Sequence, residues 1–318
     1  MIFAVTNRIP EPAVEMLRGA GEVRLDEREQ AIPRPDLLEL VAGAEAVLTL
    51  LHDRVDEELL EAAGPRLRCV ANVAVGYDNV DVAAATQRGV VVTNTPGVLD
   101  DATADLTMAL ILAATRRVAE GDRLVRSGEP WSWGMGFMLG SSLQGKRLGI
   151  VGLGGIGTRV AERARAFGMG IAYHSRRPSP AEAALEAERL SLPDLLASSD
   201  VLSLHCPLTP ETHHLIGAAE LAAMKPSAVL VNAARGPIVD EAALAAALAG
   251  GRIAAAGLDV FEREPEVEPG LLALDNAVLT PHLGSATVET RTAMAELAAR
   301  NAISVLRGQG PLTPVTAQ

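Results

Sequence analysis

The sequence predicts an α/β protein with two doubly wound domains, each a parallel β-sheet with helices on both faces. Short β-branched runs alternate with Ala- and Leu-rich helical patterns along nearly the whole chain, which is typical of parallel strands joined by crossover helices. The alternation comes in two series, before and after a long helical pattern at residues 101–128. A chain of 318 residues is also longer than one hydrophobic core usually serves.

Each series interleaves strand patterns with helical ones. In the first third of the chain, the expected strands are residues 2–6, 46–50, 68–73 and 90–94, and the expected helices are residues 12–21, 35–44 and 55–64. The second series starts at Lys146, and its expected strands are residues 146–154, 170–175, 200–206, 228–234, 253–260 and 277–282. Helical patterns such as residues 158–168 and 240–251 separate these strands.

Two long helical patterns suggest how the domains are connected. Residues 101–128 lie between the series, and residues 287–308 follow the second one. We expect the chain to leave the first domain along one helix and to return along the other. The first domain is then discontinuous and comprises residues 1–98 and 287–318. The second domain comprises residues 99–286.

The composition excludes several classes of partner. A formal net charge of −12 argues against nucleic acid or an anionic membrane as the main partner, although it allows a local basic pocket. Apolar runs fall far short of the roughly 20 residues that a membrane span needs. The N-terminus reaches charge and proline too early for a signal peptide. Cys69 and Cys206 lie in apolar runs, so we expect both to be reduced in a cytoplasmic protein.

Three glycines, Gly152, Gly154 and Gly157, follow a buried-strand pattern and open a helical one. This spacing alone is weak evidence, but the flanking patterns are the context that it requires. The glycines would allow a tight turn, close approach of a pyrophosphate and close packing of the helix on the strand. The helix N-terminus would offer free N–H groups to the phosphates. The alternative is merely a tight turn; we expect a Rossmann-like dinucleotide site. Residues 99–286 are then the dinucleotide-binding domain, and the discontinuous first domain is expected to be the substrate-binding domain.

The stretch IAYHSRRP, residues 171–178, predicts which dinucleotide is bound. An acidic residue usually meets the adenosine ribose here, about 20 residues past the first glycine. This chain instead has His174, Ser175, Arg176 and Arg177. A carboxylate would repel a 2′-phosphate, whereas a guanidinium matches phosphate geometry with two hydrogen bonds. A solvated basic loop is the alternative; we predict NADPH as the preferred cofactor, with NADH as the second choice.

Three ionisable residues follow different strands of the second series. His282 lies at the end of the strand pattern 277–282, Glu264 follows the strand pattern 253–260, and Arg235 ends the pattern 228–234. Open α/β sheets bind ligands at the carboxyl ends of their strands. Reduction of a ketone needs a proton donor, a cation that holds the substrate and a group that tunes the donor. The three residues together are a better candidate than any one of them, for which capping or surface pairing would suffice.

Five longer motifs occur in order between about residues 45 and 290. They are NVAVGYDNVDVAAATQRGVVVTNTPGVLDDATADLTMAL, GKRLGIVGLGGIG, VNAARGPIVDEAALAAAL, AAAGLDVFEREP and TPHLGSAT. Together they resemble the D-isomer-specific 2-hydroxyacid dehydrogenases, and most closely the glyoxylate/hydroxypyruvate reductase branch.

The resemblance implies roles for the candidate residues. Arg235 corresponds to the arginine that clamps the substrate carboxylate and polarises the keto oxygen. His282 corresponds to the general acid/base, and Glu264 to the carboxylate that pairs with it and favours imidazolium. The implied substrate-binding residues are Leu51, Val75, Gly76, Arg235 and His282, with Val75 and Gly76 acting through backbone N–H groups.

The resemblance also implies a set of cofactor-binding residues and no metal. The set is Thr103, Gly152, Leu153, Gly154, Gly155, Ile156, Gly157, Ser175, Arg176, Arg177, Cys206, Pro207, Thr212, Ala233, Ala234, Arg235, Asp259, His282 and Gly284. Within it, Asp259 matches the acid that orients the nicotinamide carboxamide, and Cys206 is a bystander rather than a nucleophile. One departure is Gly155, where many relatives carry Arg, and this would loosen a pyrophosphate contact.

The two tryptophans of the chain, Trp131 and Trp133, lie between the long helical pattern and the glycine turn. Members of this branch dimerise through this region, and one such Trp can approach the active site of the partner. A local packing anchor is the alternative for the pair. We expect a homodimer.

These observations predict an NADPH-dependent reductase of small 2-oxo acids, with glyoxylate and hydroxypyruvate as the leading substrate candidates. Another 2-keto acid is the main alternative, including a bulkier one if the loop around Leu51 is open. A non-catalytic dinucleotide sensor, like the corepressors that share this fold, would lack or vary the Arg/Glu/His set, which is complete here. Phosphoglycerate dehydrogenase is disfavoured because the chain ends at Gln318 with no added domain. Formate dehydrogenase is disfavoured because its extra N-terminal segment is missing.

Overall fold

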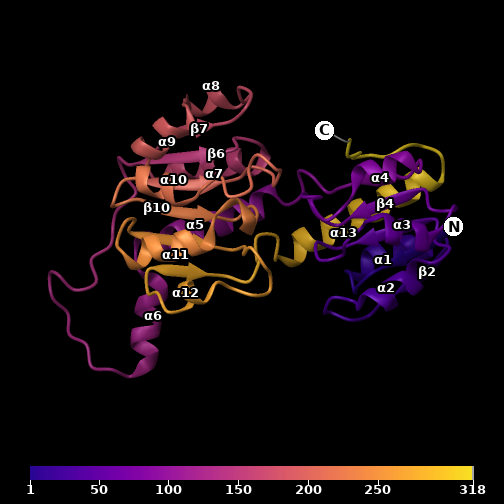
Figure 1. Ribbon diagram of the computed structural model, residues 1–318, viewed down its shortest axis with the longest axis horizontal. Coiled ribbons are helices and arrows are strands. Elements are labelled where there is room, and N and C mark those ends of the chain that lie inside the picture. Colours follow the sequence, from indigo (N-terminus) through magenta and orange to yellow (C-terminus); the bar gives the residue numbers. More distant parts are fainter. Residues whose placement is uncertain (317–318) are drawn as a thin grey trace. The chain divides into compact units, whose positions relative to one another are not determined.

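The computed structural model describes residues 1–316, which form two compact units (Figure 1). The first unit comprises Met1–Leu99 and the chain from Ala286 onward, and the second comprises Asp100–Ser285. The first unit is therefore discontinuous in sequence. Each unit is an α/β domain built on its own parallel sheet, which confirms the predicted fold class.

The first unit has a five-stranded parallel sheet in the order β2-β1-β3-β4-β5. Its strands are β1 (Ile2–Val5), β2 (Glu22–Leu25), β3 (Ala46–Thr49), β4 (Cys69–Asn72) and β5 (Val91–Thr93). Its helices are α1 (Glu11–Arg18), α2 (Arg34–Val41), α3 (Glu57–Ala63), α4 (Val82–Gln87) and α13 (Val288–Leu306). Side-chain caps begin several helices: Asp56, for example, accepts a hydrogen bond from the Leu59 amide at the start of α3.

Helices cover both faces of this sheet. One core joins α2, α3 and α4 to strand residues such as Val47, Val70 and Val92. On the other face, α1 packs against α13, which also contacts β3 and β4. Since α13 follows the second unit in sequence, the C-terminal helix completes the core of the N-terminal domain. The strand order reverses between β1 and β3, which is where open sheets of this type bind ligands.

The second unit has a seven-stranded parallel sheet in the order β12-β11-β10-β9-β6-β7-β8. Its strands are β6 (Arg147–Val151), β7 (Gly170–His174), β8 (Glu188–Arg189), β9 (Val201–Leu204), β10 (Val229–Asn232), β11 (Ala255–Leu258) and β12 (Ala277–Leu279). Its helices are α5 (Asp100–Thr115), α6 (Val118–Ser127), α7 (Gly155–Ala166), α8 (Glu182–Leu185), α9 (Leu192–Ser198), α10 (Ala218–Ala223), α11 (Glu241–Ala249), α12 (Pro269–Leu272) and the 3₁₀ turn η1 (Gly236–Ile238). From β8 to β11 the order is that of a Rossmann fold, with its switch point between β6 and β9.

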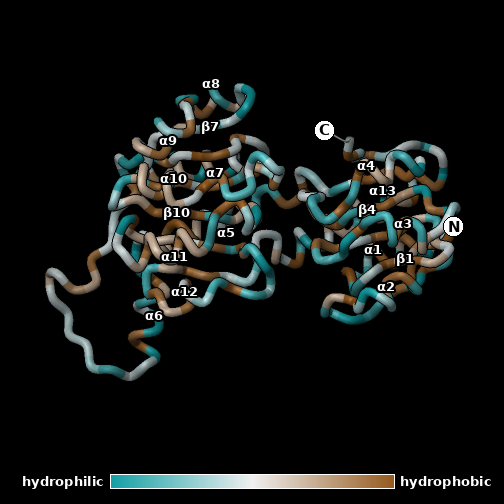
Figure 2. The backbone as a smooth tube through the Cα atoms, viewed as in Figure 1, coloured by the Kyte–Doolittle hydropathy of each residue, from teal (hydrophilic) through white to brown (hydrophobic). Residues whose placement is uncertain are grey.

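Alternate residues along the strands of the second unit enter two different cores. Leu148 and Ile150 of β6 pack with α5 and α7, whereas Val151 and Leu204 pack with α9, α10 and α11 on the opposite face. Helices therefore bury both faces, which explains why these strands are continuous hydrophobic runs (Figure 2). All six strands predicted for the second series are present.

The long helical pattern at residues 101–128 forms two helices, α5 and α6, instead of the single helix expected. Arg117 interrupts it with a left-handed backbone conformation, φ 55°. Its guanidinium binds Glu120, with Nε–Oε2 and Nη2–Oε1 distances of 2.7 and 2.6 Å. Helix α5 has many buried residues and α6 has none. The apolar pattern that suggested one buried helix therefore belongs to α5 alone.

Strand β2 and helix α4 were not expected from the sequence. Strand β2 lies at the edge of the first sheet, and none of its residues is fully buried. An edge strand has too few buried positions to produce a hydrophobic run. Helix α4 spans only six residues, which is too short for a helical period to be visible.

Both cysteines are free, as predicted. Burial raises the pKa of the Cys69 thiol to about 12 and that of the Cys206 thiol to about 11, so each is a neutral thiol at pH 7. Among residues 1–316, no helix is both long enough and apolar enough to cross a membrane.

Candidate active site

The glycine turn joins β6 to α7 at the switch point of the second sheet. Gly152 has φ 95°, and a Cβ there would lie 2.8 Å from main-chain atoms of His205 and Cys206. Only glycine therefore allows the loops after β6 and β9 to meet this closely. Gly154 is the N-cap of α7, and a Cβ built on it meets nothing within 4 Å. Open space beside Gly154, together with the free N–H groups of the first turn of α7, fits a bound pyrophosphate.

Asp100 lies against the first residue of α7. A Cβ at Gly155 would be 2.3 Å from the Asp100 Oδ2 atom. Burial raises the pKa of this carboxyl, and the charge of Asp101 adds to that effect while Arg159 opposes it. The glycine at 155 therefore makes room for a carboxyl group that is desolvated beside the glycine turn. Sequence reasoning missed Asp100.

The loop after β7 presents two exposed arginines. Neither the Arg176 nor the Arg177 guanidinium forms a hydrogen bond or ion pair within residues 1–316. Arg189 of β8 stabilises the backbone of this loop, since its Nη2 donates to the carbonyls of Ser175 and Arg176, at 3.0 Å each. His174 is hydrogen-bonded through Nδ1 to the Leu190 carbonyl at 3.0 Å. The loop therefore has no acidic side chain and presents positive charge to solvent.

The loop after β9 also borders the glycine turn. His205 is hydrogen-bonded to Ser203 through Nε2 at 2.8 Å, while its buried Nδ1 has no partner within the described chain. Burial lowers the pKa of His205 to about 4, so this imidazole is neutral. Further along the loop, the Thr212 hydroxyl donates to the Pro207 carbonyl at 2.7 Å. The high pKa of Cys206 is consistent with its being a bystander.

Glu264 and His282 are in direct contact. The distance from His282 Nδ1 to Glu264 Oε2 is 2.8 Å. Burial disfavours the ionised carboxylate, but the hydrogen bond and charge of His282, the Phe261 amide and the charge of Arg235 outweigh it and lower the pKa of Glu264. An ionised carboxylate can only accept hydrogen bonds, so Nδ1 carries the hydrogen and Nε2 is left for other chemistry.

The segments that hold Arg235 and Glu264 pack against each other. A Cβ at Gly236 would lie 1.9 Å from the carbonyl carbon of Phe261, so no larger residue fits at 236. Beyond this contact, the Glu241 amide donates to Glu262 Oε1 at 2.8 Å, and the Glu262 amide donates to Glu241 Oε1 at 2.7 Å. This reciprocal pair fixes the spacing between the two segments.

Asp259 organises the turn on which His282 lies. Its Oδ1 accepts from Leu283 N at 2.7 Å and its Oδ2 from Gly284 N at 2.8 Å. The Thr280 hydroxyl also donates to Oδ1, at 2.6 Å. A Cβ at Gly284 would lie 3.4 Å from the side chain of Thr103 of α5. The resemblance implied a contact of Asp259 with the cofactor; the internal role in the structure was not foreseen, although its position at the end of β11 was a signal for it.

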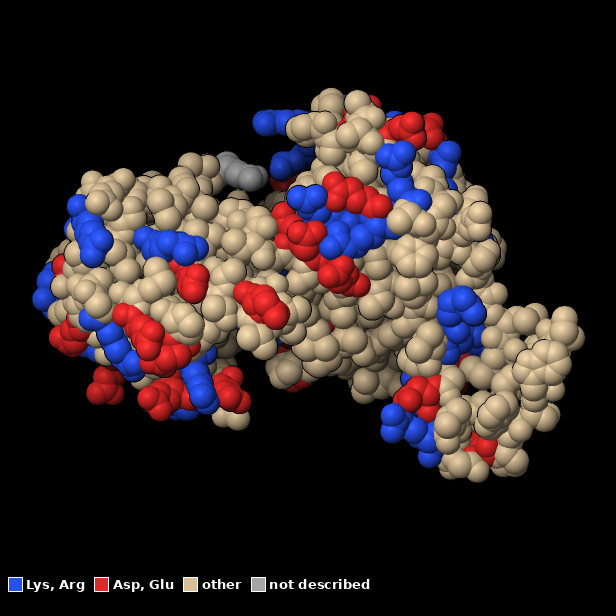
Figure 3. Space-filling view, turned by 180° about the vertical axis from the view of Figure 1, so that it is seen from behind, with Lys and Arg blue, Asp and Glu red and all other residues tan. Residues whose placement is uncertain are grey.

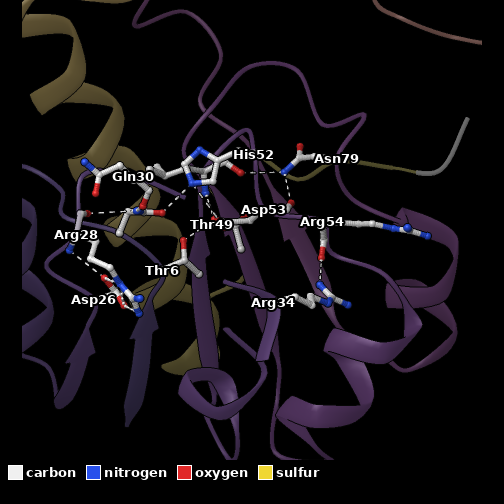
Figure 4. Close-up of polar contacts among 12 residues, drawn as sticks. Thr6, Asp26, Arg28, Gln30, Arg34, Thr49, His52, Asp53, Arg54 and Asn79 are labelled. Atoms are coloured by element: carbon white, nitrogen blue, oxygen red, sulfur yellow. Dashed lines mark hydrogen bonds and ion pairs between the residues drawn. The ribbon is translucent and has the colours of Figure 1, made fainter. Parts of the chain in front are cut away.

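The remaining predicted substrate residues lie in the first unit. Leu51 is in the turn after β3 and is 37% exposed. Val75 and Gly76 are in the loop after β4, and both are partly exposed. These turns follow neighbouring strands, β3 and β4, at the carboxyl edge of the sheet (Figure 4). Within the first unit, the structure therefore places Leu51 in one turn, and Val75 and Gly76 together in the loop that follows the neighbouring strand.

Known proteins with a similar sequence or a similar fold indicate which family the chain belongs to. A family model described as D-isomer specific 2-hydroxyacid dehydrogenase, NAD binding domain, matches residues 108–284. The chain is 53% identical over 317 residues to the glyoxylate reductase of Pyrococcus furiosus, covering 98% of this chain and 94% of that one. A crystal structure of a Thermus thermophilus protein matches with a TM-score of 0.93 and 47% identity, covering 99% of this chain and 100% of that one.

A third match carries ligands. It is an NADPH-dependent glyoxylate/hydroxypyruvate reductase of Sinorhizobium meliloti in complex with NADP and malonate, with a TM-score of 0.84 and 36% identity over 99% of this chain and 96% of that one. Fold, glycine turn and matches together define an NAD(P)-dependent oxidoreductase. The chain belongs to the D-isomer-specific 2-hydroxyacid dehydrogenase family, in its glyoxylate reductase branch.

Proposed function

We propose that the protein is an NADPH-dependent reductase of small 2-oxo acids, with glyoxylate and hydroxypyruvate as its first substrates. The observation that carries this proposal is the 2.8 Å contact between His282 and Glu264, with Arg235 near enough to lower the pKa of Glu264 by its charge. A proton donor, its carboxylate partner and a cation are the groups that reduction of a keto acid requires. The relatives named glyoxylate reductase support the substrate class.

The proposed chemistry divides between the cofactor and three side chains. When bound, the reduced nicotinamide supplies the hydride. His282 donates a proton from Nε2 to the oxygen on which negative charge develops, because its Nδ1 is committed to Glu264. Glu264 remains ionised, orients the imidazole and stabilises its charged form. Arg235 pairs with the substrate carboxylate and stabilises the developing charge on the keto oxygen.

In the first unit, Leu51 and the backbone amides of Val75 and Gly76 are the proposed substrate contacts. Within residues 1–316, neither of these amides has a hydrogen-bond acceptor. Two adjacent free N–H groups at the end of a strand are a suitable site for a carboxylate.

The proposed cofactor site is the glycine turn together with the loops after β7, β9 and β10. The exposed guanidinium groups of Arg176 and Arg177, in a loop without an acidic side chain, support NADPH over NADH. The remaining proposed contacts are Thr103, the residues of the glycine turn, Ser175, Cys206, Pro207, Thr212, Ala233, Ala234, Arg235, Asp259, His282 and Gly284. The NADP complex of the Sinorhizobium meliloti reductase supports this cofactor.

We also propose that the protein is a homodimer, in which the arm (residues 129–142) contacts a second copy. The arm extends away from the second sheet and has little charge (Figures 1 and 3). Trp133 is 77% exposed and Met135 82%, which is unusual for large apolar side chains. Trp131 stacks on Phe137 with ring centroids 6.1 Å apart, so the arm has local order of its own.

A substrate panel tests the function. Oxidation of NADPH and NADH is followed by absorbance with glyoxylate, hydroxypyruvate, pyruvate and bulkier 2-oxo acids. We expect turnover to be highest with NADPH as cofactor and with glyoxylate and hydroxypyruvate as substrates. Tight NADPH binding without turnover of any 2-oxo acid would refute the proposal and favour a dinucleotide sensor.

A further inference from the structure

We propose that three asparagines, Asn72, Asn79 and Asn94, are positioning residues that direct the amides of Val75 and Gly76 toward the substrate carboxylate. The inference deepens the proposed function and rests on it. It concerns only the carboxyl edge of the first sheet, where the turns after β3, β4 and β5 lie beside one another. None of the three asparagines contacts the reacting atoms in this proposal.

Because the peptide bond is planar, a hydrogen bond to the carbonyl of one residue also fixes the direction of the N–H group of the next residue. The C=O of one residue and the N–H of the next belong to one rigid plane and point in opposite directions. Asn94 Nδ2 donates to the Val75 carbonyl at 2.8 Å, which fixes the direction of the Gly76 N–H. The Thr95 amide donates to the Ala74 carbonyl at 2.9 Å and fixes the Val75 N–H in the same way. Both free amides are therefore oriented by bonds to the carbonyls behind them.

Asn72 closes the other side of the loop. Its Nδ2 donates to the Gly76 carbonyl at 2.9 Å, and its Oδ1 accepts from the Thr49 hydroxyl at 3.0 Å. The Asn72 side chain is fully buried, so these bonds are shielded from water. The Val75–Gly76 segment is thus held at consecutive carbonyls while its amides stay unpaired within the described chain.

Asn79 joins this loop to the turn that contains Leu51. Its Nδ2 donates to the carbonyls of Leu50 and Asp53, at 3.0 Å each (Figure 4). Asp53 is itself buried, with Oδ2 accepting from the Leu50 amide at 2.7 Å and from the Thr6 hydroxyl. The side-chain amides of Asn72 and Asn79 are 3.3 Å apart. One network therefore fixes the proposed pocket wall and the proposed carboxylate site together.

The test compares Asn94→Ala with a matched control, Asn276→Ala. Asn276 also donates to two main-chain carbonyls, of Leu248 and Ala254, but in the second unit and away from the glycine turn and the His282 turn. The Asn94 main chain keeps its bonds to Thr313 when the side chain is removed, so we expect the variant to fold. Asn79→Ala is a second variant, and circular dichroism with thermal unfolding checks that each variant is folded.

We expect Asn94→Ala to raise KM for glyoxylate about tenfold or more, the loss typical of one bond to a charged group. The dissociation constant of oxamate, an unreactive 2-oxo acid analogue, should rise by a similar factor in the presence of NADPH. The dissociation constant of NADPH should change less than about twofold, since the cofactor site lies in the other unit; kcat should change less than KM. Asn276→Ala should leave all of these values unchanged.

Several results would overturn the inference. Unaltered KM and oxamate affinity in Asn94→Ala and Asn79→Ala, while the wild-type enzyme reduces glyoxylate, would reject the positioning role and leave the proposed function standing. Equal losses of NADPH and oxamate affinity would show a general structural defect instead. Absence of oxamate binding by the wild-type protein would reject the carboxylate site itself. A wild-type protein that binds oxamate but turns over no 2-oxo acid would refute the reductase. If Asn94→Ala then abolished the oxamate binding, the positioning role would still be supported.

Discussion

His282 lies on a turn whose backbone is unfavourable for most residues. Its φ is 52°, in the left-handed region, and its amide donates to the Asp259 carbonyl at 2.8 Å. Such a conformation persists only where surrounding bonds enforce it, and it is often found at functional sites. The bonds from Thr280, Leu283 and Gly284 to the Asp259 carboxylate supply that enforcement. These bonds fix the backbone position from which the imidazole reaches Glu264.

Replacement of His282 tests the proton donor. We expect His282→Gln to lower kcat by about 10²–10⁴-fold, because an amide cannot donate a proton to the developing alkoxide. NADPH affinity, measured by fluorescence titration, should be retained as the control. Near-normal turnover would show that the proton comes from another group.

Replacement of Glu264 tests the carboxylate that holds the donor, through activity and through the pH dependence of stability. Glu264→Gln should lower kcat about tenfold, because a neutral amide holds the Nδ1–H group of His282 less strongly than an ionised carboxylate does. Because the pKa of Glu264 is lowered in the folded protein, its contribution to stability is present above the ordinary glutamate pKa. That contribution is lost as the pH falls through the lowered value. Thermal unfolding should then show that the stability difference between variant and wild type shrinks in acid, and an unchanged kcat would argue against the pair.

Replacement of Arg235 tests the substrate clamp. Arg235→Ala should raise KM for glyoxylate strongly and lower kcat, since the guanidinium contributes to both substrate and transition-state binding. Arg235→Lys should recover only part of the loss, because a lysine cannot form the two-pronged contact with a carboxylate. Steady-state kinetics of both variants that match the wild type would remove Arg235 from the site.

At the scale of elements, several loops at the carboxyl edge of the second sheet depend on neighbouring segments. The glycine turn lies close to the loop after β9 because Gly152 has no side chain. The segment that holds Arg235 packs closely on Phe261 because residue 236 is also a glycine. The loop after β7 depends on Arg189 from β8, a strand of two residues. These supports come from other strands of the sheet, so none of them is visible in the sequence of the loop itself.

The β7 loop makes a prediction about cofactor choice. Replacing Arg176 and Arg177 by Ala together with His174→Asp should shift preference from NADPH toward NADH. The variant removes the cations for a 2′-phosphate and adds an acceptor for a 2′-hydroxyl. Dissociation constants for both cofactors measure the effect, with Arg165→Ala as a control that removes a cation outside this loop. Equal NADPH affinity before and after would show that these residues do not select the cofactor.

At the scale of the whole molecule, the arm makes a prediction about assembly. Trp131→Ala with Trp133→Ala should lower the mass measured by sedimentation or light scattering from that of a dimer toward that of a monomer. The large exposed apolar surface of the arm is otherwise unexplained. Leu272→Ala, at another exposed apolar position in the second unit, should leave the mass unchanged. A wild-type protein that is a monomer would contradict the proposed homodimer.

The sequence by itself determined the fold class, because strand–helix alternation, strand hydrophobicity and the context of the glycines are local properties of the chain. It also determined the residue types of the proposed site, since Arg235, Glu264 and His282 each follow a strand pattern. Only the tertiary structure decided that α5 and α6 are separate, that Asp259 supports the His282 turn, and that Asn94 and Asn72 donate to the carbonyls of Val75 and Gly76. These features depend on hydrogen bonds and contacts between residues far apart in sequence, and no local pattern records them.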